Sequence, residues 1–154
     1  MKKRIASFDL DQTLLDHSNY QIPESAMRAL ERLRENFYIV LSTGRDMDNY
    51  YSKQYGDFVR PDAVIHLNGT KITEGDQLIY EHRMEQGLLE RLLDYADKSG
   101  YAIGVTIGAE DYYLHPEKVE EMDLHRWGQS ERRFKEPREL LDQGVRTLAY
   151  IGFE

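Results

Sequence analysis

The sequence contains no cysteine, which excludes disulfide bonds, thiolate metal sites and cysteine nucleophiles and fits a reducing compartment. It also lacks an apolar run approaching the ~18 residues that a membrane-spanning helix needs. The basic start, Met1–Arg4, is followed by a short apolar stretch, Ile5–Phe8, instead of the hydrophobic region of a secretory signal. These absences predict a cytoplasmic protein with no membrane partner.

Positive charge is scarce in this chain. Lys and Arg number 20 against 28 Asp and Glu, and the net charge is -8. Because no basic surplus exists to neutralise phosphates, the composition argues against a general nucleic-acid binder. A small anionic substrate fits this charge if the site supplies its own positive groups. With 40% hydrophobic and 31% charged residues, the 154 residues suit one ordinary domain or two small ones.

Two aspartates follow the first apolar stretch. Ile5–Phe8 has no helical period and predicts a buried strand of a parallel sheet, and Asp9 and Asp11 come directly after it. In an extended chain these two carboxylates point to the same side and repel, so the pKa of one should rise unless a cation intervenes. A hard divalent cation held by oxygens, such as Mg2+, removes that conflict. The carboxyl ends of parallel strands are where such folds bind ligands.

A βαβ unit follows this acidic segment. Apolar residues recur at three- and four-residue intervals and predict a helix that faces a sheet: Met27, Leu30, Leu33 and Phe37. The next apolar run, Tyr38–Leu41, predicts a second strand, which should lie parallel to the first as its neighbour.

The second strand ends in a polar segment, Ser42–Asp46, before a further predicted helix in which Met47, Tyr51 and Tyr55 share a face. Hydroxyls, the glycine and the arginine of this segment would meet a helix N-terminus, an arrangement that favours an anion. The alternative is that Ser-Thr-Gly merely caps the helix. The acidic end of the adjacent strand favours the anion site.

A third strand, Ala63–Leu67, is closed by Asn68–Thr70. His66 within this apolar run is more typical of a core histidine with satisfied hydrogen bonds than of a ligand or base. Residues 71–83 alternate around a polar turn and predict a β-hairpin.

We assign residues 1–83 to one domain and 84–154 to a second, whose pattern is antiparallel in style. The expected elements of the second domain are a helix over 85–98, strands over 101–107 and 112–114, a helix over 116–125, a charged loop over 129–137, a short helix over 138–142 and a last strand over 146–153.

The order of these motifs resembles the haloacid dehalogenase superfamily, specifically the Cof-type (IIB) phosphatases with a C2 cap. Three segments carry the resemblance, each after a strand: Asp9-x-Asp11-x-Thr13, Ser42–Arg45 and Asn68–Thr70. One acidic loop alone would be weak, but three motifs in this order are specific. The resemblance implies an α/β fold: a Rossmann-like parallel sheet, represented by its first three core strands, followed by an incomplete α+β cap.

The resemblance further implies a Mg2+-dependent phosphatase of small phosphorylated metabolites, such as sugar phosphates, that forms an aspartyl-phosphate intermediate. Asp9 matches the nucleophile and Asp11 the general acid/base, and both match the metal-binding positions. Thr43, Gly44 and Leu10 match the positions that bind the phosphoryl oxygens.

Other motif residues match positions with supporting roles in the family that the sequence resembles. Thr13 matches a residue that supports the acidic loop, and Arg45 and Asn68 match positions that contact substrate and cap. Gln12 stands where the family usually has glycine, so the loop must have a conformation that a side chain tolerates.

Two parts of the family's machinery cannot be placed in this sequence: the lysine of the third motif and the acidic cluster of the fourth. The chain therefore matches only the front of a longer pattern, and the first strand should present an exposed edge. We expect self-association or a complementary chain at that edge. The alternative function is a truncated, non-catalytic module that binds phosphate or a partner chain. A receiver domain fits less well, because receivers carry their acidic pair and phosphoacceptor on different strands.

Overall fold

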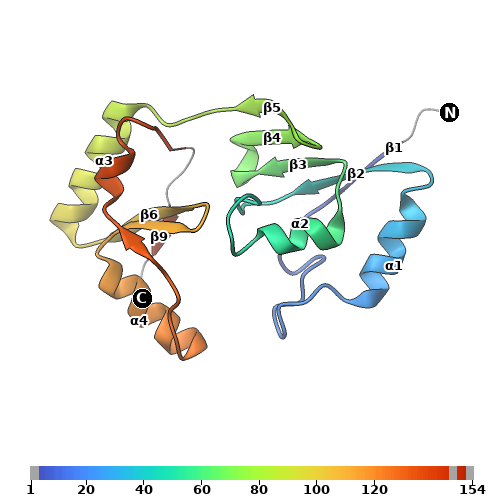
Figure 1. Ribbon diagram of the computed structural model, residues 1–154, viewed down its shortest axis with the longest axis horizontal. Coiled ribbons are helices and arrows are strands. Elements are labelled where there is room, and N and C mark those ends of the chain that lie inside the picture. The colour runs from blue at the N-terminus through green and yellow to red at the C-terminus, as the bar shows by residue number, and fades with distance from the viewer. Residues whose placement is uncertain (1–3, 146–148, 152–154) are drawn as a thin grey trace. The chain divides into compact units, whose positions relative to one another are not determined.

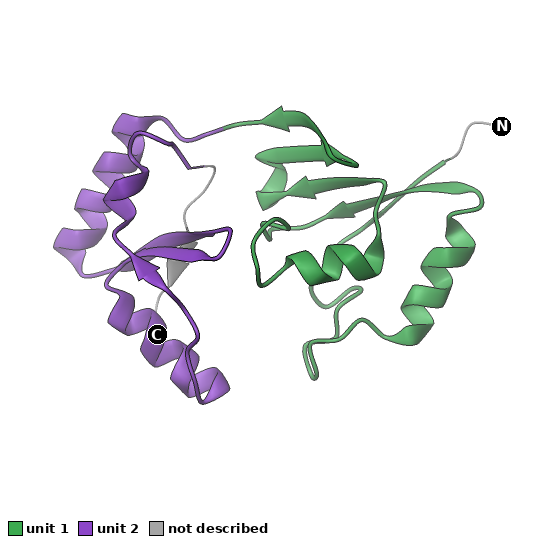
Figure 2. Cartoon of the chain, in the orientation of Figure 1, with its two compact units in different colours: residues 1–82 green, residues 83–154 purple. Residues whose placement is uncertain are grey.

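The computed structural model describes residues 4–145 and 149–151. The chain divides into two compact units, Met1–His82 and Arg83–Glu154, which Figure 2 colours separately. Each unit contains one sheet, and Figure 1 labels most of the elements. The fold belongs to the expected α/β class.

The first unit is built on a five-stranded sheet of order β1-β2-β3-β4-β5. Its strands are β1 (Arg4–Phe8), β2 (Phe37–Ser42), β3 (Ala63–His66), β4 (Lys71–Glu74) and β5 (Gln77–Glu81). β1, β2 and β3 run parallel, with Phe8 opposite Leu41 and Ser42 opposite Ile65. Because parallel strands share a direction, their carboxyl ends lie along one edge. The loops that carry the sequence motifs therefore leave the sheet side by side.

Two helices cover one face of this sheet. They are α1 (Glu24–Leu33) and α2 (Lys53–Val59), and they contact each other. Both crossovers advance in the same direction across the sheet, so right-handed connections place both helices on the same face. Ile39 and Leu41 of β2 are 0% exposed in the core with Leu30 of α1, as the helical stripe predicted. Phe37, the last residue of that predicted stripe, is instead the first residue of β2. By contrast, Ile5 of β1 is 70% exposed.

The antiparallel strands β4 and β5 form the predicted hairpin and extend the sheet beyond β3. The β4–β5 register shifts by one residue between Ile72 and Thr73, which is an irregularity of the β-bulge type. β1 and β5 are the two edge strands of the sheet.

The second unit has a four-stranded sheet of order β8-β7-β6-β9. Its elements are α3 (Gln86–Ser99), β6 (Ala102–Ile107), β7 (Glu110–Leu114), α4 (Pro116–Trp127), β8 (Phe134–Lys135), the 3-10 helix η2 (Pro137–Leu140) and β9 (Ala149–Ile151). β6 pairs antiparallel with β7 and β9, while β8 pairs parallel with β7. α3 confirms the helix expected over 85–98, and its residues Leu89, Leu93 and Ala96 lie in the core.

A buried ionic network stabilises the second unit. Asp111 is 0% exposed and accepts hydrogen bonds from the Thr106 hydroxyl at 2.6 Å and from the Arg132 guanidinium at 3.2 Å. The Arg132 Nε atom also donates to Asp123 at 2.7 Å, and the Ser130 hydroxyl donates to Asp123 at 3.1 Å. Because each buried charge has partners, this network fixes the loop between α4 and β8.

Three expectations from the sequence need correction or remain open. The helix after β2 begins only at Lys53, so Met47 and Tyr51 lie outside it. The predicted charged loop over 129–137 contains the short strand β8. The expected last strand is present over Ala149–Ile151, while its residues 146–148 and 152–153 lie outside the described residues. None of the helices in the described part of the chain has the length and apolar character that crossing a bilayer requires.

Candidate functional site

The loop after β1 is held around one main-chain carbonyl. The side chain of Leu10 is 0% exposed, and its carbonyl accepts hydrogen bonds from the N–H groups of Thr13, Leu14 and Leu15 at 3.3, 3.0 and 2.8 Å. Burial of Leu10 thus anchors the acidic segment at the strand end. Asp9 is exposed, and its Oδ1 accepts the Leu10 N–H at 2.8 Å. Thr13 supports the loop through its backbone N–H.

Gln12 has a left-handed backbone, with a φ of 58°. Its N–H donates to the Leu15 carbonyl at 3.0 Å, which closes the turn. A left-handed conformation strains a residue with a Cβ by about 1 kcal/mol, and glycine avoids that strain. The loop was expected to have a conformation that a side chain tolerates, but it keeps one that favours glycine and that Gln12 adopts only under this strain.

Asp11 is bound by two basic side chains. The Arg45 guanidinium donates from Nε to Asp11 Oδ2 at 2.7 Å and from Nη2 to Oδ1 at 2.6 Å. His17 Nε2 lies 2.7 Å from the same Oδ1. The hydrogen bonds from Arg45 are the main cause that lowers the pKa of Asp11 below its ordinary value; burial opposes the shift and His17 adds to it. The same ion pair raises the pKa of Arg45.

Aromatic rings surround this ion pair. The Arg45 guanidinium carbon lies 5.5 Å from the centroid of the Tyr55 ring, and Tyr55 is only 6% exposed. The Tyr55 hydroxyl donates to the Tyr20 carbonyl at 3.4 Å, and the Tyr20 ring stacks on His17 at a centroid distance of 5.4 Å. These contacts link α2 to the loop after β1 and hold both basic groups next to Asp11.

Backbone hydrogen bonds join the loops after β2 and β3. The Thr43 N–H donates to the Ile65 carbonyl at 2.9 Å, the Leu67 N–H to the Arg45 carbonyl at 3.2 Å, and the Asn68 N–H to the Thr43 carbonyl at 3.3 Å. Thr43 is 4% exposed, and its hydroxyl accepts the Arg45 N–H at 3.1 Å. The two motifs therefore form one rigid unit at the strand ends.

Gly44 and Asn68 meet within this unit. A Cβ at Gly44 would lie 3.1 Å from Asn68 Oδ1, which is a tight contact. Asn68 has a positive φ of 57°, and so does Leu67, with a φ of 50°. Asparagine tolerates this conformation better than most residues. The Gly44 position is therefore specific for a small residue because Asn68 occupies the adjacent space.

No α-helix begins at Ser42–Asp46. The segment from Asp46 to Ser52 turns, and α2 starts at Lys53. Asp46 Oδ1 accepts the Asp48 N–H at 3.1 Å, and Asn49 Oδ1 accepts the Ser52 N–H at 3.0 Å. Such side-chain-to-backbone bonds compete with helix formation. Both the helix-cap interpretation and the helix-dipole argument for an anion here are thus wrong, and any anion must be bound by loop N–H groups and Arg45.

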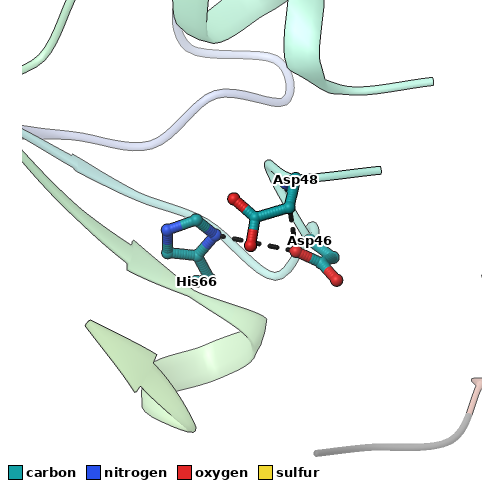
Figure 3. Close-up of side chains that lie close together, drawn as sticks. All are labelled: Asp46, Asp48 and His66. Carbon is teal, nitrogen blue, oxygen red and sulfur yellow. Dashed lines mark hydrogen bonds and ion pairs between the residues drawn. The ribbon is translucent and has the colours of Figure 1, made fainter. Parts of the chain in front are cut away.

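Asp46, Asp48 and His66 lie close enough to hold a metal ion, with one ligand atom from each within 4.8 Å of the others. Figure 3 shows these side chains converging, with dashed lines from Asp46 to His66 and to Asp48. However, the Lys71 ammonium pairs with Asp48, and His66 Nδ1 accepts the Met47 N–H at 3.2 Å. The cluster thus already contains a cation and a donor.

Asp9 and Asp11 offer a better set of oxygen ligands for a hard cation. Among the described residues, the hydrogen bonds leave Asp9 Oδ2 and the main-chain carbonyl of Asp11 without a donor. The Asp11 carboxylate itself is engaged by Arg45 and His17. The two oxygens that remain available as metal ligands, a carboxylate oxygen and a carbonyl oxygen, are of the types that Mg2+ prefers.

The structure thus brings together Asp9, Leu10, Asp11 and Thr13 in one loop and Thr43, Gly44, Arg45 and Asn68 in the neighbouring pair of loops. Sequence reasoning missed His17 and Tyr55. Neither lies in a motif, and only the fold of the loop and the late start of α2 bring them to Asp11 and Arg45. A histidine six residues from an aspartate carries no recognisable spacing signal.

Comparisons with known proteins show which sequences and structures this chain is similar to. The sequence model of the haloacid dehalogenase-like hydrolases matches residues 6–150. The Bacillus subtilis (strain 168) protein named "Putative phosphatase YkrA" is 26% identical over 104 residues, which are 67% of this chain and 39% of that protein.

Solved structures show the same fold. BT1666 from Bacteroides thetaiotaomicron superposes with a TM-score of 0.75 at 20% identity, over 92% of this chain and 52% of that one. BT4131, described as a sugar phosphatase of subclass IIB, superposes with a TM-score of 0.74 at 21% identity, over 94% of this chain and 56% of that one. The chain thus spans about half the length of these solved structures, and less of the curated relative.

Proposed function

The chain belongs to the haloacid dehalogenase-like hydrolase family. We propose that it acts as a Mg2+-dependent phosphatase that hydrolyses phosphate monoesters of small metabolites. One observation carries this proposal: the acidic loop after β1 and the Thr43–Arg45 loop after β2 meet at the strand ends, joined by the Asp11–Arg45 ion pair. Two carboxylates, loop N–H groups and a guanidinium are the groups that phosphoryl transfer needs.

In the proposed reaction, an oxygen of Asp9 attacks phosphorus while the bond from phosphorus to the ester oxygen breaks. Asp11 gives its proton to the departing alkoxide, which leaves as an alcohol. A water molecule then attacks phosphorus in the aspartyl-phosphate and Asp11 takes the proton of that water, so that Asp9 is released as a carboxylate with inorganic phosphate. Thr43 and Gly44 supply donors for the phosphoryl oxygens, and the Leu10 N–H does so once it leaves Asp9 Oδ1. Arg45 and Asn68 contact the substrate.

Mg2+ fits the two oxygen ligands that are available here, Asp9 Oδ2 and the main-chain carbonyl oxygen of Asp11. When bound there, the cation would neutralise charge on the carboxylates and on the phosphoryl group. The exposure of Asp9 leaves room for both a cation and a phosphate. The substrate class, sugar phosphates among other small phosphate esters, rests on similarity to the sugar phosphatase BT4131.

The ion pair has a consequence for the two proton transfers. Arg45 keeps Asp11 ionised, which suits the second step, where Asp11 accepts a proton from water. For the first step Asp11 must carry a proton, and the guanidinium opposes this. Arg45 must therefore leave Asp11 before the ester bond breaks, and the phosphate of the substrate is the anion that competes for it.

Hydrolysis of a generic aryl phosphate with Mg2+ tests the proposal. We expect turnover that disappears in Asp9→Asn and persists in Asp76→Asn, which makes the same change in the exposed turn of the β4–β5 hairpin. Turnover that survives Asp9→Asn would refute the assigned nucleophile. Loss of turnover on removal of Mg2+ by a chelator, with recovery on its return, tests the cofactor.

A second candidate is a non-catalytic module that binds phosphate or a partner chain. The edge strand β1 favours it, because β1 pairs only with β2 among the described strands and Ile5 is 70% exposed. We propose that this edge self-associates or pairs with a complementary chain. Sizing and hydrogen exchange test the idea: a monomer whose Ile5 and Ser7 amides exchange freely would contradict it. Phosphate binding without turnover would favour the module over the enzyme.

A further inference from the structure

His66 ends β3 in the interior of the first unit, where it is only 2% exposed. Both ring nitrogens have partners: Nδ1 accepts the Met47 N–H at 3.2 Å, and Nε2 lies 3.1 Å from the Thr73 hydroxyl oxygen. Because a backbone N–H can only donate, Nδ1 carries no proton and Nε2–H is the donor to Thr73. The interpretation of His66 as a satisfied core histidine is therefore confirmed.

The partner of Nδ1, the Met47 N–H, connects this histidine to the loop after β2. Met47 follows Arg45 by two residues in the loop that carries Thr43 and Gly44, and it is 6% exposed. A buried backbone N–H needs an acceptor, and the imidazole supplies it from the neighbouring strand. Backbone bonds from Thr43, Leu67 and Asn68 hold the beginning of this loop. His66 holds the segment just after Arg45.

An ion pair beside His66 ties the same loop to β4. Asp46 Oδ1 lies 3.8 Å from Nδ1 and accepts the Asp48 N–H, and the Lys71 ammonium of β4 pairs with Asp48. The loop after β2 is thus tied to β3 through His66 and to β4 through Lys71. Figure 3 shows His66 with Asp46 and Asp48. Lys71 thus provides a positive charge that compensates one of the two carboxylates, that of Asp48.

We propose that His66 is a positioning residue for phosphate binding: through Met47 it sets where the Thr43–Arg45 loop presents its donors. This inference rests on the proposed function, because its first test measures phosphate binding. His66 does not touch the reacting atoms. It acts because Met47 lies in a turn before α2, where its N–H donates to the imidazole of His66, a buried side chain, instead of to a main-chain carbonyl.

Two substitutions separate this role from ordinary packing. Asparagine at position 66 places its amide oxygen near the position of Nδ1 and can accept the Met47 N–H, but it does not reach Thr73. Glutamine places its amide nitrogen near the position of Nε2 and can donate to Thr73, but it leaves Met47 without an acceptor. Both remove a ring of the same size from the same buried place, so both should lower stability similarly.

The test measures the affinity for inorganic phosphate by calorimetry in the presence of Mg2+, together with the stability of each variant. We expect His66→Gln to weaken phosphate binding about 10-fold, the order that loss of one buried hydrogen bond gives. His66→Asn and the control Thr73→Val should stay within about 3-fold of the wild type. Equal affinities in the Gln and Asn variants, whether unchanged or equally weakened, would overturn the proposal.

A second readout distinguishes failure of this inference from failure of the proposed function. If the wild type binds no phosphate, the proposed function fails, and hydrogen exchange of the Gly44 and Met47 amides decides about His66. Faster exchange in His66→Gln than in His66→Asn supports the positioning role. The same exchange rates in both variants would refute it.

Discussion

The pair of Asp11 and Arg45 can be tested without any substrate, by a double-mutant cycle of stability with Arg45→Met and Asp11→Asn. The pair has two charge-assisted hydrogen bonds of 2.7 and 2.6 Å, and the side chains of Asp11 and Arg45 are 29% and 27% exposed. Fully exposed pairs contribute about 0.2–1 kcal/mol, whereas breaking a buried pair costs about 3–5 kcal/mol. For this partly exposed bidentate pair we expect a coupling free energy of about 1.5 kcal/mol.

The coupling must depend on pH with a definite sign. The pKa of Asp11 is lowered in the folded protein, mainly by Arg45, so the folded state favours the ionised carboxylate. The contribution is therefore fully present above the unfolded pKa of an aspartate and is lost as the pH falls through the folded pKa. We expect the coupling near pH ~7 to decline in the acidic range and to approach zero once Asp11 is protonated.

Urea denaturation of the wild type, the two single variants and the double variant measures this coupling. Glu24 and Arg28 provide a matched control, since they form an exposed pair four residues apart on α1, with side chains 77% and 61% exposed. Their coupling should be about 0.3–0.5 kcal/mol. A coupling of Asp11 with Arg45 no larger than the control, or one that does not fall at acidic pH, would refute the reasoning.

Three further substitutions test local features. Gln12→Gly should change the free energy of unfolding by less than about 1 kcal/mol in urea denaturation, because relief of the left-handed strain offsets the greater freedom of glycine in the unfolded chain; a larger loss would contradict the strain argument. Gly104→Ala should cost about 3 kcal/mol, because its Cβ would lie 2.0 Å from the Tyr112 carbonyl oxygen, and a variant as stable as the wild type would be incompatible with that contact. Hydrogen bonding to Glu74 raises the pKa of Tyr38 to about 12. The stability of the protein should therefore fall as the pH rises from the ordinary tyrosine pKa towards that value, and Tyr38→Phe should abolish this fall. A phenolate absorbance titration checks the pKa itself.

The parallel part of the fold was predictable because its signals are local. β1, β2 and β3 are short apolar runs, and each is followed by polar motif residues that end the strand. α1 and α3 carry stripes at helical spacing. The loop after β2 was predicted less well, since Met47, Tyr51 and Tyr55 have helical spacing although only Tyr55 lies in α2. There, side-chain-to-backbone hydrogen bonds of Asp46 and Asn49 outweigh the periodicity.

The site was predictable to the extent that it lies in motifs. The positions of Asp9, Thr43 and Gly44 follow from the ends of neighbouring parallel strands. The contacts of Asp11 with His17 and of Arg45 with Tyr55 do not follow from any spacing, because they depend on how two loops and α2 pack. The short strand β8 has the same character: it forms because Asp111 and Tyr112 pair with a two-residue segment, which no periodicity can reveal.

The charge conflict expected between Asp9 and Asp11 has a resolution within the chain itself. The guanidinium of Arg45 takes both oxygens of the Asp11 carboxylate, while Asp9 stays exposed with one backbone donor. The two carboxylates thus have different surroundings: one is neutralised, and the other is available to a cation or to phosphorus. A phosphate dianion that binds beside Asp9 adds negative charge next to the Arg45 guanidinium. Its binding must therefore weaken the hold of Arg45 on Asp11, which is the change that the acid step requires.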